Sequence, residues 1–206
     1  MSEFLTPAIG ILNIPNEKLP HLDEISYYVL EKERKLYLDF EISEDVFSIQ
    51  RMILRWNMED KYKCKEERRP IWLYIHSPGG DLSYMWMLVD TIKLSLTPVY
   101  TVNLGMAASA ASLIFIAGHK RFMMPTSKVL IHEGSASFAG DAGKLMDATD
   151  SYKKELKAMK EFILSNTSIP RTQLMKKRSN DWELDAAYCL ENKVCDRIIE
   201  NIEEII

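Results

Sequence analysis

From residue 35 onward, hydrophobic and polar positions follow a pattern that predicts alternating strands and helices. Residues 35–40 (KLYLDF) alternate between apolar and polar positions, which predicts a strand. From Ser43, a candidate N-cap, to about Met58, apolar residues recur at helical spacing. The apolar face of this predicted helix consists of Val46, Ile49, Met52, Ile53 and Trp56. The first 25 residues show little periodicity and are interpreted as an N-terminal arm.

A regular strand–helix rhythm follows. The apolar run IWLYI (71–75) predicts a buried strand, and residues 81–93 predict an amphipathic helix. A second apolar run, VYTVNL (99–104), predicts another strand that Gly105 breaks, and a helix of small residues comes next. Because strands alternate with helices, we expect parallel strand pairing with right-handed crossovers.

The last third of the chain is richer in polar residues. KRFMMP (120–125) and KVLIH (128–132) predict two short strands, and residues 141–166 predict a long helix whose polar face carries Lys and Glu. Small helices are expected over 172–177 and 185–190, with Asn192 in a left-handed C-terminal position. VCDRII (194–199) predicts a final strand. No repeat or domain-sized linker is visible, so residues 1–206 are expected to form a single domain.

Composition narrows the classes of function. The formal net charge of −4 favours neither nucleic acid nor an anionic membrane as a partner. There is no signal-peptide pattern and no apolar run of about 18 residues. The spacing of Cys64, Cys189 and Cys195 matches no zinc or redox motif. We therefore expect a cytoplasmic protein with reduced cysteines and no metal.

Small and polar residues interrupt the apolar rhythm at two points. Gly79 and Gly80 follow a strand, where they either form a plain turn or present amides to an anion. Ser109 stands where a strand gives way to a helix, so it is either an N-cap or a nucleophile near the positive end of the helix dipole. The G-x-S-x-G elbow of α/β-hydrolases is not present, because Ala107 and Ala111 occupy the glycine positions.

Candidates for acid–base chemistry lie elsewhere along the chain. His132 ends an apolar run, where a histidine is either a strand-end residue or a catalytic base. Asp181 by itself fits a loop or capping residue, and His76, just before the glycine pair, is a second candidate histidine. The stretch GDAGKL (140–145) is not a nucleotide-binding loop, because its glycines are too close and Leu145 replaces the magnesium-binding Ser or Thr. We expect no cofactor in this chain.

Taken in order, these motifs resemble the ClpP family, the proteolytic subunits of Clp peptidase. The matching segments are YIHSPGGD, GMAAS, KRFMMP, VLIHE and NDWELDAAYCLENKVCDRI. The resemblance covers roughly residues 25–199 and is nearly continuous over 72–122. It implies an α/β fold of the crotonase-like type, a superhelix of βαβ units, with a protruding strand–helix handle over residues 133–166.

The resemblance implies a role for each candidate. Ser109 would be the nucleophile, His132 the general base, and Asp181 the residue that orients and stabilises the imidazolium. The amides of Gly80 and Ala110 would form the oxyanion hole. Four apolar or aromatic positions match the family's unfoldase-docking pocket, although ordinary core packing would explain them equally well. These positions are Trp72, Tyr74, Val102 and Phe122.

The resemblance also implies an assembly and partners. The expected substrate is an unfolded polypeptide, bound as an extended strand and cleaved inside a homo-oligomeric ring, either a heptamer or a tetradecamer of two stacked rings. An AAA+ unfoldase would use ATP on behalf of the peptidase.

Departures from the family pattern leave alternatives open. Glu133 and Gly134 follow the histidine where the family has Gln-Pro, and the carboxylate adds negative charge near the expected base. Ser179 and Asn180 precede Asp181, where the family usually has an arginine that joins two rings. The alternatives are a catalytically weak structural subunit of a mixed ring, a prophage-type head maturation protease, and an acyl-CoA enzyme on the same fold.

Overall fold

The computed structural model describes residues 29–30, 32–134, 137–177 and 181–206. The chain divides into two units, Met1–Arg34 and Lys35–Ile206. The second unit contains the sheet and all the candidate site residues. The N-terminal arm predicted over residues 1–25 and the Ser179–Asn180 pair lie outside the described residues.

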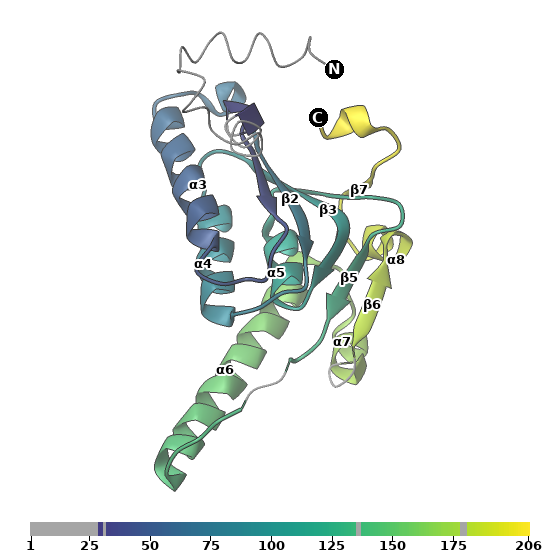
Figure 1. The fold of residues 1–206 in the computed structure, drawn as a ribbon. Coiled ribbons are helices and arrows are strands. Elements are labelled where there is room, and N and C mark those ends of the chain that lie inside the picture. Colours follow the sequence, from purple (N-terminus) through teal and green to yellow (C-terminus); the bar gives the residue numbers. More distant parts are fainter. Residues whose placement is uncertain (1–28, 31, 135–136, 178–180) are drawn as a thin grey trace, which may run out of the picture. The chain divides into compact units, whose positions relative to one another are not determined.

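Within the described residues the second unit is built on a seven-stranded sheet (Figure 1). Five strands follow the order β1-β2-β3-β4-β7, and each neighbouring pair in this path is parallel. Their bounds are β1 (Lys35–Leu38), β2 (Ile71–Ser77), β3 (Val99–Ala108), β4 (Lys120–Met123) and β7 (Arg197–Ile198). The remaining two, β5 (Lys128–Ile131) and β6 (Trp182–Asp185), pair antiparallel with each other, and β5 also pairs parallel with β3.

Helices lie between successive strands except between β4 and β5, much as the strand–helix rhythm predicts. They are α3 (Val46–Asp60), α4 (Leu82–Lys93), α5 (Ala110–Ala117), α6 (Ala142–Asn166), α7 (Arg171–Lys177) and α8 (Ala186–Glu191), with short 3-10 turns at Lys65–Glu67 (η2) and Ile202–Glu204 (η3). Asp81 begins α4 by accepting the backbone N–H groups of Ser83 and Tyr84, which satisfies two donors of the first turn. The parallel pairs β1–β2, β2–β3, β3–β4, β3–β5 and β4–β7 confirm the predicted parallel pairing, whereas β5 and β6 pair antiparallel.

Three local expectations are wrong. Gly105 does not break β3, because the strand changes partner there, pairing with β4 through Asn103 and with β5 from Met106. Asp45, rather than Ser43, is the residue at the N-terminus of α3. Asn192 has φ −95°, and the left-handed position after α8 belongs to the next residue, Lys193, with φ 53°.

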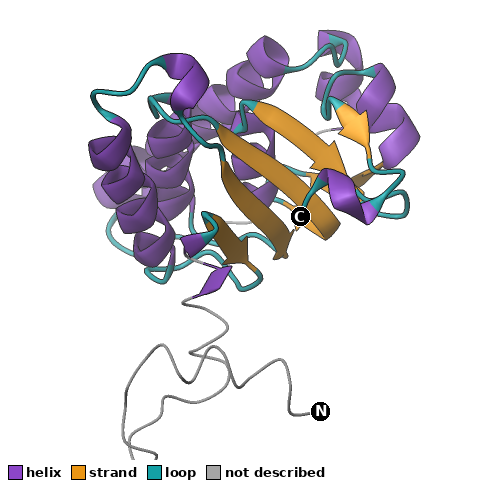
Figure 2. Cartoon of the chain, turned by 90° about the horizontal axis from the view of Figure 1, so that it is seen from above, coloured by secondary structure: helices purple, strands orange, loops and turns teal. Residues whose placement is uncertain are grey.

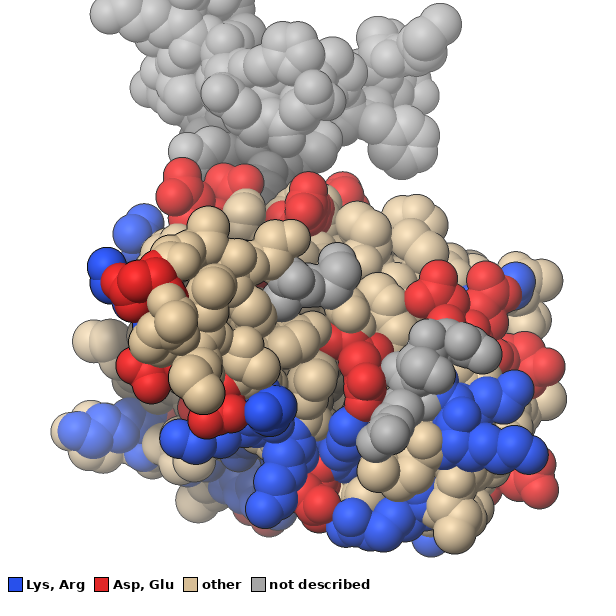
Figure 3. Space-filling model, turned by 90° about the horizontal axis from the view of Figure 1, so that it is seen from below, with Lys and Arg blue, Asp and Glu red and all other residues tan. Residues whose placement is uncertain are grey.

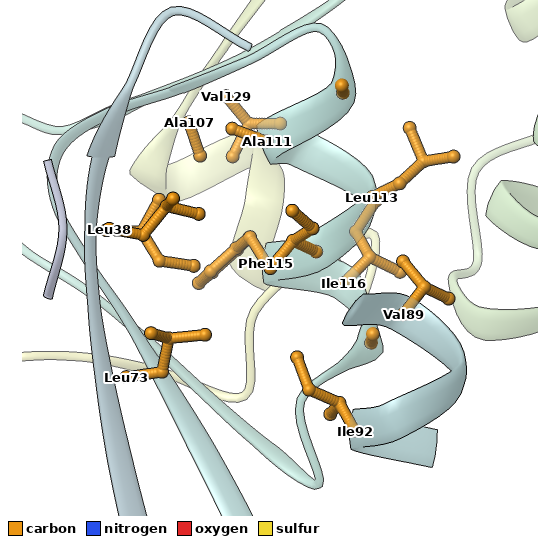
Figure 4. Close-up of a cluster of buried hydrophobic side chains, with 14 of the residues drawn as sticks. Leu38, Leu73, Val89, Ile92, Ala107, Ala111, Leu113, Phe115, Ile116 and Val129 are labelled. Atoms are coloured by element: carbon orange, nitrogen blue, oxygen red, sulfur yellow. The ribbon is translucent and has the colours of Figure 1, made fainter. Parts of the chain in front are cut away.

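The main core lies between one face of the sheet and helices α3, α4 and α5. Figure 2 shows a group of helices along one side of the strands. Phe115 of α5 lies at its centre among side chains from the strands and from α4 (Figure 4). Because side chains alternate along a strand, Leu73 of β2 enters this core while its neighbour Tyr74 faces the opposite side of the sheet. There a second, smaller cluster forms around Tyr74, Val102, Ile199 and Ile205.

Helix α6 has two different parts. In Figure 1 its first turns extend away from the sheet, whereas its last turns pack against the rest of the unit. Its two buried residues, Met159 and Ile163, lie in this anchored part. The predicted long helix is thus confirmed. No helix among the described residues combines the length and the apolar character that crossing a membrane requires.

Candidate active site

Ser109 lies at a sharp turn between β3 and α5. Its backbone has φ 54° and ψ −124°, a conformation that costs a residue with a side chain on the order of 1–3 kcal/mol. The N–H of Ser109 donates to Leu130 O of β5 at 2.9 Å, and Ser112 Oγ donates to Ser109 O at 2.6 Å. The Ser109 side chain makes no capping bond to α5. The strained turn thus points the hydroxyl away from the helix, as in a nucleophile elbow, although alanines replace the usual glycines.

The Ser109 hydroxyl is part of a chain of hydrogen bonds across three segments. Ser109 Oγ lies 2.7 Å from His132 Nε2, and His132 Nδ1 lies 3.0 Å from Asp181 Oδ1. Because a carboxylate can only accept, the proton of a neutral imidazole belongs on Nδ1, which leaves Nε2 to accept the serine hydroxyl. The imidazole can therefore take the proton from Ser109 while the carboxylate stabilises the resulting charge.

The pairing of β5 with β6 brings the histidine and the aspartate together. Ile131, the last residue of β5, stands opposite Trp182, the first residue of β6. His132 follows the first strand and Asp181 precedes the second, so antiparallel pairing places them side by side at the same end of the ladder. Sequence analysis missed β6, and its alternating Trp-Glu-Leu-Asp pattern (182–185) was the available signal.

The two partners of the imidazole differ in their contact with water. The Asp181 side chain is 72% exposed, whereas the His132 side chain is 31% exposed. Water screens a charge on an exposed carboxylate, so we expect Asp181 to orient and stabilise the imidazole less strongly than a buried carboxylate would.

The glycine pair packs directly against this serine turn. Gly79 has φ +100°, and a Cβ built on it would lie 2.7 Å from Ser109 Cβ and 3.1 Å from Ala110 N. Gly80 forms a parallel bridge with Ile42, in which Ile42 N–H donates to Gly79 O and Ile42 O accepts the N–H of Asp81. This bridge does not use the Gly80 N–H.

Ala110, the first residue of α5, has an N–H that a helix leaves without an intrahelical partner. The Gly80 amide belongs to the glycine turn and the Ala110 amide to the serine turn. These two turns are in contact at Gly79. The assignment of the two amides to an oxyanion hole stays a prediction.

Buried Ser77 stabilises the glycine turn. Its Oγ–H donates to Phe40 O at 2.6 Å, and the same oxygen accepts the N–H of Gly79 at 3.3 Å. The hydroxyl therefore ties the end of β2, the chain after β1 and the glycine turn together. Sequence analysis gave Ser77 no role, although a serine directly before Pro-Gly-Gly is typical of a turn whose side chain bonds nearby backbone.

Glu133, which we expected to add charge near His132, has a partner of its own. Its carboxylate Oε1 lies 2.5 Å from Lys160 Nζ of α6, and Tyr152 Oη of the same helix donates to the Glu133 carbonyl at 2.7 Å. Sequence analysis missed both partners. The ion pair offsets the extra negative charge beside the imidazole.

The other histidines have different surroundings. A Cβ built on Gly105 would lie 2.8 Å from His76 Nδ1, so His76 stands over Gly105, and Ser109 is hydrogen-bonded to His132 instead. His119 Nδ1 accepts the N–H of Val99, and burial lowers the pKa of His119. Its neutral form is thereby favoured in a structural role.

The cysteines are all free thiols. Cys64 is exposed, and Cys189 and Cys195 are buried. Burial raises the pKa of the Cys195 thiol to about 11 and that of Cys189 further. Among the described residues, no three His, Cys, Asp or Glu side chains are grouped so that they could hold a metal ion.

The four predicted docking positions share the face of the sheet opposite the helices. Val102 is fully buried and Tyr74 is 5% exposed, while Trp72 and Phe122 are partly buried and pack against them. The rings of Trp72 and Phe122 are 5.4 Å apart. Tyr74 Oη donates to the carbonyl of Ile205, so the C-terminal residues cover part of this aromatic cluster.

Charged side chains of both signs lie together on one face of the molecule. On the face seen from below in Figure 3, groups of Lys and Arg lie among Asp and Glu, with uncharged surface between them. This mixture fits the small net charge of the chain.

An α/β sheet that carries a hydrogen-bonded Ser–His–Asp chain at a strained strand–helix turn has the arrangement used by serine hydrolases. Comparison of the sequence with known proteins identifies the family. The model of the Clp protease family matches residues 22–202, so this chain belongs to the Clp protease family.

Several curated relatives support this membership. The chain is 34% identical over 143 residues to "ATP-dependent Clp protease proteolytic subunit 2" of Treponema denticola, covering 66% of this chain and 70% of the relative. It is 28% identical over 179 residues to "ATP-dependent Clp protease proteolytic subunit" of Dehalococcoides mccartyi, covering 86% and 87%. It is 27% identical over 186 residues to the subunit 2 of Corynebacterium diphtheriae, covering 89% and 90%.

Proposed function

We propose that this chain is a Clp-type serine endopeptidase with Ser109, His132 and Asp181 as its catalytic residues. The observation that carries the proposal is the continuous hydrogen-bonded chain from Ser109 Oγ through His132 to Asp181. The strained backbone of Ser109 supports the same conclusion, because such strain persists where the surrounding structure maintains it and is common at active sites.

The proposed reaction follows from this geometry. His132 Nε2 takes the proton of Ser109 Oγ as the oxygen attacks the scissile carbonyl, and the amides of Gly80 and Ala110 stabilise the oxyanion. The imidazolium then protonates the leaving amine, and the C–N bond breaks to give an acyl-enzyme. Water, deprotonated by the same imidazole, attacks the ester and releases the peptide acid, which restores the serine hydroxyl.

We extend the proposal to the substrate, the assembly and the finer fold. The substrate is an unfolded polypeptide, the βαβ units form a crotonase-like superhelix, and residues 133–166 are its handle. The chain assembles into a heptameric ring or a tetradecamer, and a partner AAA+ unfoldase uses the ATP. The aromatic cluster around Trp72 and Phe122 receives an apolar segment of that unfoldase. The relatives' names, which include "ATP-dependent" and "proteolytic subunit", support an ATP-using partner and an assembly of subunits.

Labelling with a fluorophosphonate tests the chemistry. We expect the assembled protein to be labelled at Ser109 and to cleave a fluorogenic peptide, and we expect Ser109→Ala to lose both properties. Ser48→Ala is the matched control, because Ser48 is exposed on α3 and its hydroxyl donates to the nearby Asp45 carbonyl at 2.7 Å. Absence of labelling, together with unchanged cleavage by Ser109→Ala, would overturn the proposal.

Native mass measurement of the homo-oligomer tests the assembly. We expect seven or fourteen times the chain mass of 23.8 kDa. Full peptidase activity of this isolated particle would distinguish the proposal from a catalytically weak subunit of a mixed ring. A monomer under conditions where Ser109 reacts would contradict the ring.

A further inference from the structure

The segment that follows His132 is fastened to helix α6 at two points. Glu133 Oε1 lies 2.5 Å from Lys160 Nζ, and the Glu133 carbonyl accepts the hydroxyl of Tyr152 at 2.7 Å. One contact uses the side chain of Glu133 and the other its backbone. Together they fix both the position and the direction of the residue bonded to the catalytic histidine.

The ion pair is better shielded from water than the other ion pairs of α6. The side chains of Lys160 and Glu133 are 19% and 28% exposed, whereas both partners of the Lys153–Asp150 pair are 68% exposed. Exposed pairs contribute little because water screens them, and a partly buried pair holds its partners more strongly. Lys160 also follows the buried Met159, so the charge projects from the anchored part of the helix.

The second contact, from the Tyr152 hydroxyl to the Glu133 carbonyl, is also supported by its surroundings. The Tyr152 ring lies against Phe138, with ring centroids 6.0 Å apart. Burial raises the pKa of Tyr152, and the nearby Glu133 carboxylate raises it further, so the hydroxyl keeps the proton that it donates. Gly134 has φ +72°, which lets the chain turn immediately after the fastened residue.

Apart from these two contacts at Glu133, the imidazole of His132 is held by its hydrogen bonds to Ser109 and Asp181. Asp181 is mostly exposed, and β5, the strand before His132, ends at Ile131. A small hollow separates the segment from α6, lined by His132 and Glu133 on one side and by Leu156, Met159 and Lys160 on the other. The ion pair spans the two sides of this hollow.

We propose that Glu133, Lys160 and Tyr152 form a clasp that positions His132, so that the alignment of the catalytic base depends on helix α6. The inference rests on the proposed peptidase function. The three residues are positioning residues, because they act on the reaction only through the histidine. Small displacements of a catalytic group can lower a rate by about 10²-fold.

Steady-state cleavage of a fluorogenic peptide by the assembled protein tests the clasp. We expect Lys160→Met to lower kcat about tenfold with little change in KM, since the charge is lost and the apolar stem remains. Tyr152→Phe removes the hydroxyl alone, and we expect a fall in kcat of about threefold to tenfold. Lys153→Met, which breaks the exposed pair on the same helix, is the control and should match the wild type.

Charge reversal separates positioning from a general loss of structure. We expect Glu133→Lys alone to lower kcat and the double variant E133K/K160E to recover a substantial part of it. Wild-type kcat in both Lys160→Met and Tyr152→Phe would overturn the clasp, as would a change confined to KM. If Lys160→Met does not fold, Tyr152→Phe decides. Failure of the wild-type protein itself to label at Ser109 would instead overturn the proposed function, and the clasp with it.

Discussion

Adding a single methyl group at Gly79 should separate the chemistry of the site from the stability of the fold. In Gly79→Ala the new Cβ would lie 2.7 Å from both Ala108 O and Ser109 Cβ, and 3.1 Å from Ala110 N. Ordinary contacts of such an atom are 3.4 Å or longer. The glycine turn and the serine turn must therefore move apart, and the Ala110 amide is one of the two proposed oxyanion donors.

The expected magnitudes come from backbone strain, from the steric clash and from the loss of an oxyanion donor. A side chain at φ +100° costs on the order of 1–3 kcal/mol, and forcing the two turns apart costs about 1–3 kcal/mol more. For a domain of this size the sum corresponds to a fall in Tm of about 4–24 °C. Loss of one oxyanion donor lowers kcat by about 10²–10³-fold. We therefore expect Gly79→Ala to have a lower Tm and, at a temperature where it is folded, a kcat that is lower by this factor.

The assay is peptide cleavage at saturating substrate, with thermal unfolding measured on the same preparations. Gly140→Ala is the matched control, because Gly140 also has positive φ, +152°, but its Cβ would touch only the side chain of Lys144. The control should lose some stability and retain wild-type kcat. A folded Gly79→Ala protein with kcat within about threefold of the wild type would refute the proposed arrangement of the two turns.

Three further predictions concern Asp181, Ser77 and the cysteines. Asp181→Asn should lower kcat by about 10²-fold, less than the roughly 10⁴-fold typical of a buried triad, because the carboxylate is 72% exposed; a fall as large as 10⁴-fold in peptide cleavage would contradict this reasoning. Ser77→Ala should lower the free energy of unfolding by about 1–3 kcal/mol, since the buried Gly79 N–H and the partly buried Phe40 carbonyl lose their partner, and denaturant titration measures it. A thiol reagent at neutral pH should modify Cys64 in the native protein and reach Cys189 and Cys195 only after unfolding, because burial keeps both thiols protonated; mass spectrometry of the native protein checks this, and early modification of Cys195 would count against it.

The local pattern of apolar and polar residues was sufficient to predict most strands of the parallel sheet. The apolar run at residues 71–75, the helix that Asp81 caps and the next apolar run near Val99 were predicted from periodicity, and the structure contains all three. These signals are local because the apolar residues of a strand or helix recur with the period that places them on its buried face. The wrong expectation at Gly105 arose because a glycine is also used where a strand changes partner and a side chain approaches closely.

The sequence predicted the residues of the candidate site but not their geometry. The order of motifs suggested Ser109, His132 and Asp181 by resemblance, but each residue alone had an ordinary structural explanation. The distance from His132 to Asp181 depends on the β5–β6 register, which pairs Ile131 with Trp182 across about fifty positions of chain. No local pattern encodes that register.

What the sequence by itself determined is the type and order of the elements, because periodicity reports which face of each element is buried. It also determined that a serine stands between a strand and a helix. Only the tertiary structure decided that this serine adopts a strained turn instead of capping its helix, and that Glu133 binds Lys160. These outcomes depend on groups distant in the chain that meet only when the sheet and α6 are assembled, so their energies exist only in the folded protein.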